Sequence, residues 1–165
     1  ETRRKIGLLR SFYHALKPQR LLVFTDRNAQ VGNIVGQLVH HGLPAGGLFG
    51  KMEKMDRKSA LAAFRSGKKS ILVTSDLSAR GLDIPELDCI VELDVPQTPE
   101  AYAHRAGRTG RAGKKGIIAT FGDEVELPRL AAIEKRLGIR VQPREVWKGE
   151  ILSPLPPDED AEEVK

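Results

Sequence analysis

The hydrophobic positions of this sequence follow two different spacings along the chain. Short continuous apolar runs occur at residues 21–24, 71–73, 89–91 and 117–119, and such runs are typical of strands covered on both faces. Between them, apolar residues recur three or four positions apart, which is the spacing of an amphipathic helix. The expected helices lie at residues 6–16, 31–39, 98–107 and 127–137 and around Leu61 and Phe64. Pro18, Gly42, Gly67 and Gly138 are expected to end four of these helices.

Strands that alternate with helices predict an α/β fold, in which helices cover both faces of a mostly parallel sheet. A length of 165 residues fits one domain, which we expect to span residues 1–152. Residues 153–165 contain three prolines and five acidic side chains. Their apolar surface is too small to fold alone, so we expect an acidic, proline-rich, disordered tail.

The charge of the chain is uneven. Lys and Arg number 27 against 22 Asp and Glu, a formal net charge of +5, although the tail itself is acidic. A basic body predicts a polyanionic partner, and a merely soluble basic surface is the alternative. The clustering of cations favours the polyanion, because residues 101–115 contain no acid. Their basic side chains are Arg105, Arg108, Arg111, Lys114 and Lys115.

Several function classes are excluded or disfavoured by what the sequence lacks. Cys89 is the only cysteine, so no intramolecular disulfide can form, and no Cys/His cluster has the spacing of a zinc site. No apolar run is long enough to span a membrane. No complete phosphate-binding glycine loop occurs, and the nearest approach, residues 45–52, lacks the first glycine and the hydroxyl after Lys51. Trp147 is expected to pack rather than to stack on a base.

Two polar segments fall where a parallel sheet binds its ligands, beyond the carboxyl ends of strands. Residues 74–83 follow the run at 71–73 and offer hydroxyls, an arginine and two carboxylates; an ordinary turn is the alternative. Residues 104–113 repeat arginine and glycine every third position. Arginine suits phosphate because it is permanently charged and donates two parallel hydrogen bonds. A helix end capped by arginine is the alternative for this second segment.

These segments resemble motifs V and VI of the DEAD-box RNA helicases, in ILVTSDLSARGLDIPELDCIVELDVP (71–96) and AYAHRAGRTGRAG (101–113). LLVFTDRN (21–28) resembles motif IV, and ALAAFRSGK (60–68) resembles the helix before motif V. The resemblance covers residues 6–137 and identifies the chain as the second, C-terminal RecA-like lobe of such a helicase. It implies a three-layer RecA-like fold.

The resemblance also implies roles for individual residues. Arg108 and Arg111 match the arginine fingers that reach the γ-phosphate of ATP, and Asp83 matches the carboxylate that binds the ribose. Residues implied to couple the two lobes are Asp76, Arg80, His104 and Arg105. Residues implied to bind RNA are Thr25, Arg27, Lys54, Arg57, Thr74 and Gly81. Three positions depart from the family pattern, since Arg27 replaces threonine, Lys54 replaces glutamine and Phe49 replaces histidine.

The expected function is therefore ATP-driven unwinding or remodelling of RNA by an intracellular helicase. ATP and Mg²⁺ are the implied cofactors, bound mainly by a first lobe that this sequence does not contain, so the chain alone should not hydrolyse ATP. The implied partners are RNA, the N-terminal lobe of the same protein and protein cofactors, with no membrane. The alternative is a non-catalytic RNA- or protein-binding module. A DNA translocase of the same superfamily is disfavoured by His104.

Overall fold

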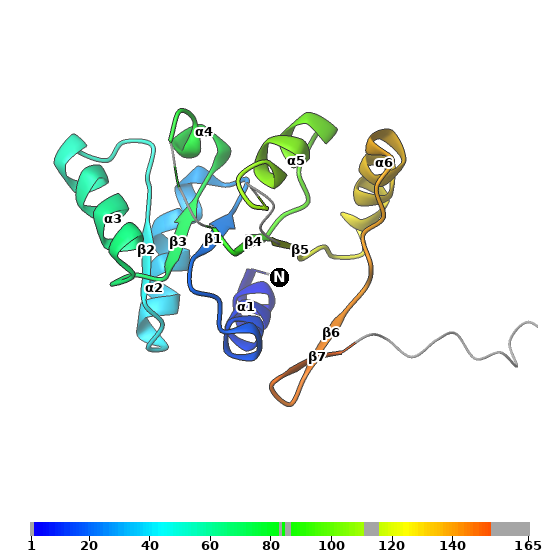
Figure 1. The fold of residues 1–165 in the computed structure, drawn as a ribbon, viewed down its shortest axis with the longest axis horizontal. Coiled ribbons are helices and arrows are strands. Elements are labelled where there is room, and N and C mark those ends of the chain that lie inside the picture. The colour runs from blue at the N-terminus through cyan, green and yellow to red at the C-terminus, as the bar shows by residue number, and fades with distance from the viewer. Residues whose placement is uncertain (1, 83, 85–86, 111–115, 153–165) are drawn as a thin grey trace, which may run out of the picture.

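The computed structural model describes residues 2–82, 84, 87–110 and 116–152. Their centre is a five-stranded parallel sheet in the order β2-β3-β1-β4-β5 (Figure 1). The strands are β1 (Leu21–Phe24), β2 (Ala45–Gly47), β3 (Ile71–Thr74), β4 (Cys89–Glu92) and β5 (Ile117–Thr120). The predicted α/β class is confirmed, and the four predicted strands are present within one residue of their expected bounds.

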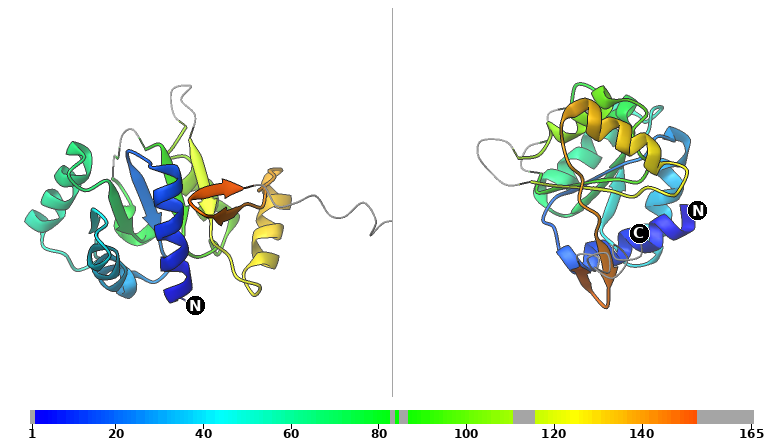
Figure 2. Two further views of the ribbon diagram at one scale, coloured as in Figure 1. Left: turned by 90° about the horizontal axis from the view of Figure 1, so that it is seen from below. Right: turned by 90° about the vertical axis from the view of Figure 1, so that its right-hand side faces the viewer.

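Helices cover both faces of the sheet, as expected (Figures 1 and 2). The helices are α1 (Thr2–Leu16), α2 (Val31–His40), α3 (Lys54–Ser66), α4 (Asp76–Ala79), α5 (Pro99–Ala106) and α6 (Leu127–Leu137), with a short 3₁₀ helix η1 (Asn28–Gln30). Apolar residues of α1 and α2 pack with Leu21 and Val23 of β1, while those of α3 and α4 pack with Leu22 and Phe24. Alternate residues of one strand thus enter two separate cores, which explains why the strands are apolar throughout.

The predicted helix ends are also observed. The Thr98 hydroxyl accepts a hydrogen bond from the amide of Ala101 (3.1 Å), and Pro99 occupies the first turn of α5. Gly67 and Gly138 follow α3 and α6 with φ angles of 85° and 66°. These are left-handed conformations that glycine adopts without a Cβ penalty.

Five elements were not expected from the sequence: the strands β2, β6 and β7, the short helix α4 and the 3₁₀ helix η1. β2 is a three-residue edge strand of Ala-Gly-Gly, whose small residues carry little strand propensity. The hairpin of β6 (Glu145–Trp147) and β7 (Glu150–Leu152) packs against α1, with Val146 and Ile151 facing the core. The prediction that Trp147 packs is wrong, since 64% of the residue is exposed. Residues 153–165, predicted to form a tail, lie outside the described residues.

Candidate functional site

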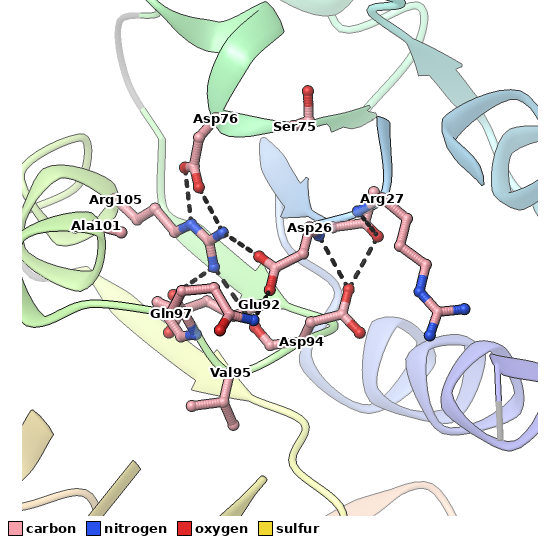
Figure 3. A network of polar contacts seen from close by, with 12 residues as sticks. Asp26, Arg27, Ser75, Asp76, Glu92, Asp94, Val95, Gln97, Ala101 and Arg105 are labelled. Carbon is pink, nitrogen blue, oxygen red and sulfur yellow. Dashed lines mark hydrogen bonds and ion pairs between the residues drawn. The ribbon is translucent and has the colours of Figure 1, made fainter. Parts of the chain in front are cut away.

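The candidate site lies where the loops after β1, β3 and β4 meet α5 at the carboxyl edge of the sheet (Figure 3). Its centre is Arg105 on α5, which is 1% exposed. The guanidinium contacts Asp76 through two nitrogens, Nε to Oδ1 at 2.9 Å and Nη2 to Oδ2 at 2.7 Å. Nη2 also contacts Asp26 Oδ1 at 2.9 Å, and Nη1 contacts Glu92 Oε2 at 3.0 Å. One buried cation therefore joins three carboxylates from three segments of the chain.

The electrostatics of this cluster keep Arg105 charged. Burial alone would lower the pKa of Arg105, but the hydrogen bonds and charge of Asp76, Asp26 and Glu92 outweigh it and raise the pKa above its usual value. Burial raises the pKa of Glu92, although the Thr120 hydroxyl and Arg105 both oppose that shift. The guanidinium carbon also lies 4.9 Å from the centroid of the Phe24 ring, a cation–π contact. The cluster is thus a fixed part of the fold rather than a mobile surface group.

Asp94, the second residue after β4, joins this cluster to a neighbouring cavity. Its Oδ2 accepts hydrogen bonds from the Thr25 hydroxyl (2.9 Å) and the Asp26 amide (3.0 Å). Burial alone would raise the pKa of Asp94, but these two bonds and the charge of Lys5 outweigh it and lower the pKa. The adjoining cavity of about 470 Å³ is lined by the loop after β1, the start of α1 and the loop before α6. The Arg27 side chain extends into this region, away from Arg105 (Figure 3).

The short helix α4 is held by its own N-cap residue and by arginine side chains from two other segments. Ser75 caps its first turn by accepting a hydrogen bond from the amide of Ser78 (3.3 Å). Arg57 of α3 donates to the carbonyl of Ser78. Arg108 donates through Nη1 to the carbonyl of Leu82 (2.8 Å) and through Nη2 to that of Ala79 (2.9 Å). Arg108 therefore binds both ends of the turn that follows α4.

The structure brings most of the predicted site residues to this edge, in different environments. Asp76, Arg105, Arg57, Arg108 and Thr25 make the contacts described above. Thr74 is buried, and its hydroxyl donates to the carbonyl of Ser75. Gly81 has a φ of 71°, which places the turn after α4 in the left-handed region. Five of the predicted residues are exposed, namely Arg27, Lys54, Arg80, Gly81 and His104. Asp83 and Arg111 lie outside the described residues.

Four residues of this edge were not singled out from the sequence: Asp26, Asn28, Glu92 and Asp94. Asp26 and Asp94 each follow an apolar strand by two residues, so a search for carboxylates at strand ends finds both. Glu92 ends the buried run of β4, and nothing in the sequence around it indicates that it pairs with Arg105. Asn28 has no motif around it that indicates its contacts.

Two negative findings apply to the described residues. No group of three or more His, Cys, Asp and Glu side chains is arranged there to hold a metal ion. None of the helices in that part of the chain has the length and apolar content required to cross a membrane. The carboxylates around Arg105 are occupied by its guanidinium, so Mg²⁺ does not fit this cluster.

Comparison with known proteins identifies relatives of this chain. The family model described as "Helicase conserved C-terminal domain" matches residues 4–113. The ATP-dependent RNA helicase CshA of Listeria monocytogenes is 37% identical over 139 residues, which cover 84% of this chain and 27% of that protein. The DEAD-box ATP-dependent RNA helicase CshC of Bacillus cereus is 32% identical over 156 residues, 94% of this chain and 40% of that protein. The chain thus spans well under half the length of these relatives.

Solved structures show the same fold. The Escherichia coli DEAD-box protein SrmB, bound to regulator of ribonuclease activity A, is 30% identical with a TM-score of 0.73, over 80% of this chain and 79% of that one. Saccharomyces cerevisiae Dbp5 bound to RNA and ADP BeF3 is 29% identical with a TM-score of 0.77, over 86% of this chain and 38% of that one.

Proposed function

The chain belongs to the helicase conserved C-terminal domain family, as the C-terminal lobe of a DEAD-box helicase, and from this premise we propose that it is the second lobe of an ATP-dependent RNA helicase. In this proposal, residues 1–152 form the lobe, and residues 153–165 a linker-like acidic tail. ATP-driven closure of two lobes remodels or unwinds RNA inside the cell. One observation carries the proposal: Arg105 and Arg108 bind the segment at residues 76–82, so the two arginine- and hydroxyl-rich segments form one surface.

Arg108 and Arg111 are the proposed catalytic residues. When the lobes close, their guanidinium groups meet the γ-phosphate of ATP. In the transition state, negative charge is spread over the three equatorial oxygens of this phosphoryl group, and the guanidinium groups stabilise it there. The position of Arg108 supports this role, because its guanidinium donates hydrogen bonds to two backbone carbonyls, which an anionic phosphate can replace as acceptors. Asp83 is the proposed ligand of the ribose hydroxyls.

The lobe's own contacts suggest how coupling to the first lobe works. His104 and Arg80 are exposed and available to a partner surface. Arg105 and Asp76 contact each other, so in our proposal they couple the lobes by fixing the surface that the first lobe meets. Mg²⁺ and the adenine are assigned mainly to the first lobe.

RNA is proposed to bind along the loops after β1 and β3 and the start of α3. Lys54, Arg57 and Arg27 supply positive charge for phosphates. Gly81 is exposed beside this path, whereas Thr25 and Thr74 are buried and act through the loops that they hold in place. Binding through phosphates depends on charge rather than on base sequence. Protein cofactors are a further proposed class of partner.

ATP hydrolysis by the full-length protein tests this function. We expect hydrolysis that RNA stimulates more than DNA of the same length, and no hydrolysis by residues 1–165 alone. A full-length protein that binds RNA without turnover supports the alternative, a non-catalytic binding module. Stimulation by DNA rather than RNA would instead indicate a DNA translocase.

A further inference from the structure

Asn28 joins the loop after β1 to α4 through a single amide oxygen. Its Oδ1 accepts hydrogen bonds from the hydroxyls of Ser75 (2.9 Å) and Ser78 (3.1 Å). Asn28 begins η1, directly after the loop that carries Thr25 and Arg27. One side chain therefore connects two segments that are far apart in the sequence.

The two hydroxyls depend on Asn28 because they have little access to water. Ser75 and Ser78 are each 3% exposed. The Ser75 oxygen already accepts from the Ser78 amide, so its own proton is directed to Asn28. Without the Asn28 oxygen, two nearly buried donors lose the acceptor that the structure gives them, which is costly in an interior of low dielectric.

The position of the Asn28 amide is also confined on its other side. A Cβ added at Gly50 would lie 2.6 Å from Asn28 Nδ2. The side chain is therefore enclosed between the backbone at Gly50, which precedes α3, and the hydroxyls of α4. It cannot easily turn to another partner while α4 keeps its place.

The segments that meet at Asn28 are those to which RNA binding is assigned above. Arg57 of α3 donates to the carbonyl of Ser78, the residue whose hydroxyl Asn28 accepts. Thr25 and Arg27 lie just before Asn28 in the chain. We propose that Asn28 is a positioning residue for RNA binding, which holds the loop after β1, the start of α3 and α4 in one fixed arrangement. This inference rests on the proposed function.

The test compares Asn28→Ala with the wild type in the full-length protein, and measures RNA-stimulated ATP hydrolysis and the thermal unfolding midpoint on the same samples. The RNA concentration for half-maximal stimulation should rise about tenfold, equivalent to about 1.4 kcal/mol. The kcat at saturating RNA should change less, because bound RNA restores the arrangement. Asn33→Ala is the matched control, since Asn33 is exposed on α2 and its amide contacts only Gln30 and Gln37 among the described residues.

A second variant keeps the test decisive if Asn28→Ala folds poorly. Ser78→Ala removes one of the two donors with little change in volume, and should raise the same RNA concentration by a smaller factor. In the double variant the two effects should be less than additive, because both changes remove the same hydrogen bond. A lowered midpoint with an unchanged RNA requirement in either variant would overturn the inference alone. A wild-type protein that RNA does not stimulate would overturn the proposed function with it.

Discussion

Arg105 and Glu92 form an ion pair of 3.0 Å in which both side chains are almost completely removed from solvent, with exposures of 1% and 0%. A buried charge without a counter-charge strongly destabilises the fold, so each member of this pair depends on the other. The pair links α5 to the end of β4, and Asp76 and Asp26 extend it to α4 and the loop after β1. The four segments of the candidate site therefore share one electrostatic anchor.

Loss of the Arg105 guanidinium should lower the free energy of unfolding more than loss of any exposed arginine. Arg105→Ala leaves Glu92 buried without its counter-charge, and should lower the free energy of unfolding by about 3–5 kcal/mol. Arg105→Lys should recover only part of this loss, since an ammonium cannot contact three carboxylates in the same planar geometry. Urea unfolding measures both values. Arg144→Ala, at an exposed position, is the control and should change stability by about 0.5 kcal/mol or less.

Arg108 is expected to affect both stability and catalysis. Arg108→Ala removes two hydrogen bonds to backbone carbonyls and should cost roughly 1–2 kcal/mol of stability. In the full-length protein it should also reduce kcat by ~10³-fold or more, with a smaller effect on ATP affinity. Arg108→Lys should not restore kcat.

Arg129 provides a matched control for Arg108. It also donates to two backbone carbonyls, those of Pro96 (3.0 Å) and Val95 (2.7 Å), at the other side of the sheet edge. Arg129→Ala should therefore lower stability by a similar amount and leave kcat unchanged. If Arg108→Ala behaves in the same way as Arg129→Ala, the assignment of Arg108 to ATP hydrolysis is wrong and its role is structural.

Arg57 should contribute to RNA binding in a way that depends on salt. Removing one phosphate contact on a single strand should reduce the slope of log K against log salt by about 0.7. Arg57→Ala should therefore weaken binding of all RNA sequences alike, more at low salt than at high salt. Fluorescence anisotropy with oligonucleotides at several salt concentrations measures the slope. Arg4→Ala, exposed on α1 at the opposite face, should keep the wild-type slope; a selective loss for one sequence would contradict a phosphate contact.

The contribution of Asp94 to stability should depend on pH. Its pKa is lowered in the folded chain, so its ionised form stabilises the fold at pH values above the unfolded pKa of about 3.9. That stabilisation disappears as the pH falls through the lower, folded pKa. Asp94→Asn should therefore be less stable than the wild type at pH 7, and the difference should shrink below about pH 4. Urea unfolding across this range, with the exposed Asp56→Asn as a control substitution, measures it; a difference that grows toward acid would contradict the hydrogen-bonded carboxylate.

The alternation of strands and helices was predicted well because most of these elements have a local pattern of apolar and capping residues that identifies them. The runs at β1, β3, β4 and β5 are apolar on both faces, and the Thr98-Pro99 start of α5 is determined by local chemistry. The hairpin of β6 and β7 was missed because its turn, Lys148-Gly149, lacks the usual Asn-Gly or Asp-Gly pair. Its place on α1 depends on tertiary contacts that no local pattern contains.

The candidate site was predicted only in part, for a related reason. The arginines of residues 104–110 were found from their spacing and from the family resemblance, but their partners were not. Glu92 resembles any strand residue in sequence, and Asp26 is far from Arg105 along the chain. Which carboxylate meets which arginine is decided by the strand order, and that order places the ends of β1, β3 and β4 side by side.

The central place of β1 also determines when this fold can be completed during synthesis. β1 is made before both of its neighbours, and Leu21 pairs with Ile71 on one side and with Cys89 on the other. An emerging chain therefore carries an apolar strand with unpaired backbone groups while a long stretch is still to be translated. Closing such long loops costs entropy before the contacts that offset it exist. A nascent chain that stalls before residue 89 leaves one edge of β1 unpaired. We expect this intermediate to aggregate more readily than the complete chain, and therefore to depend more on chaperones.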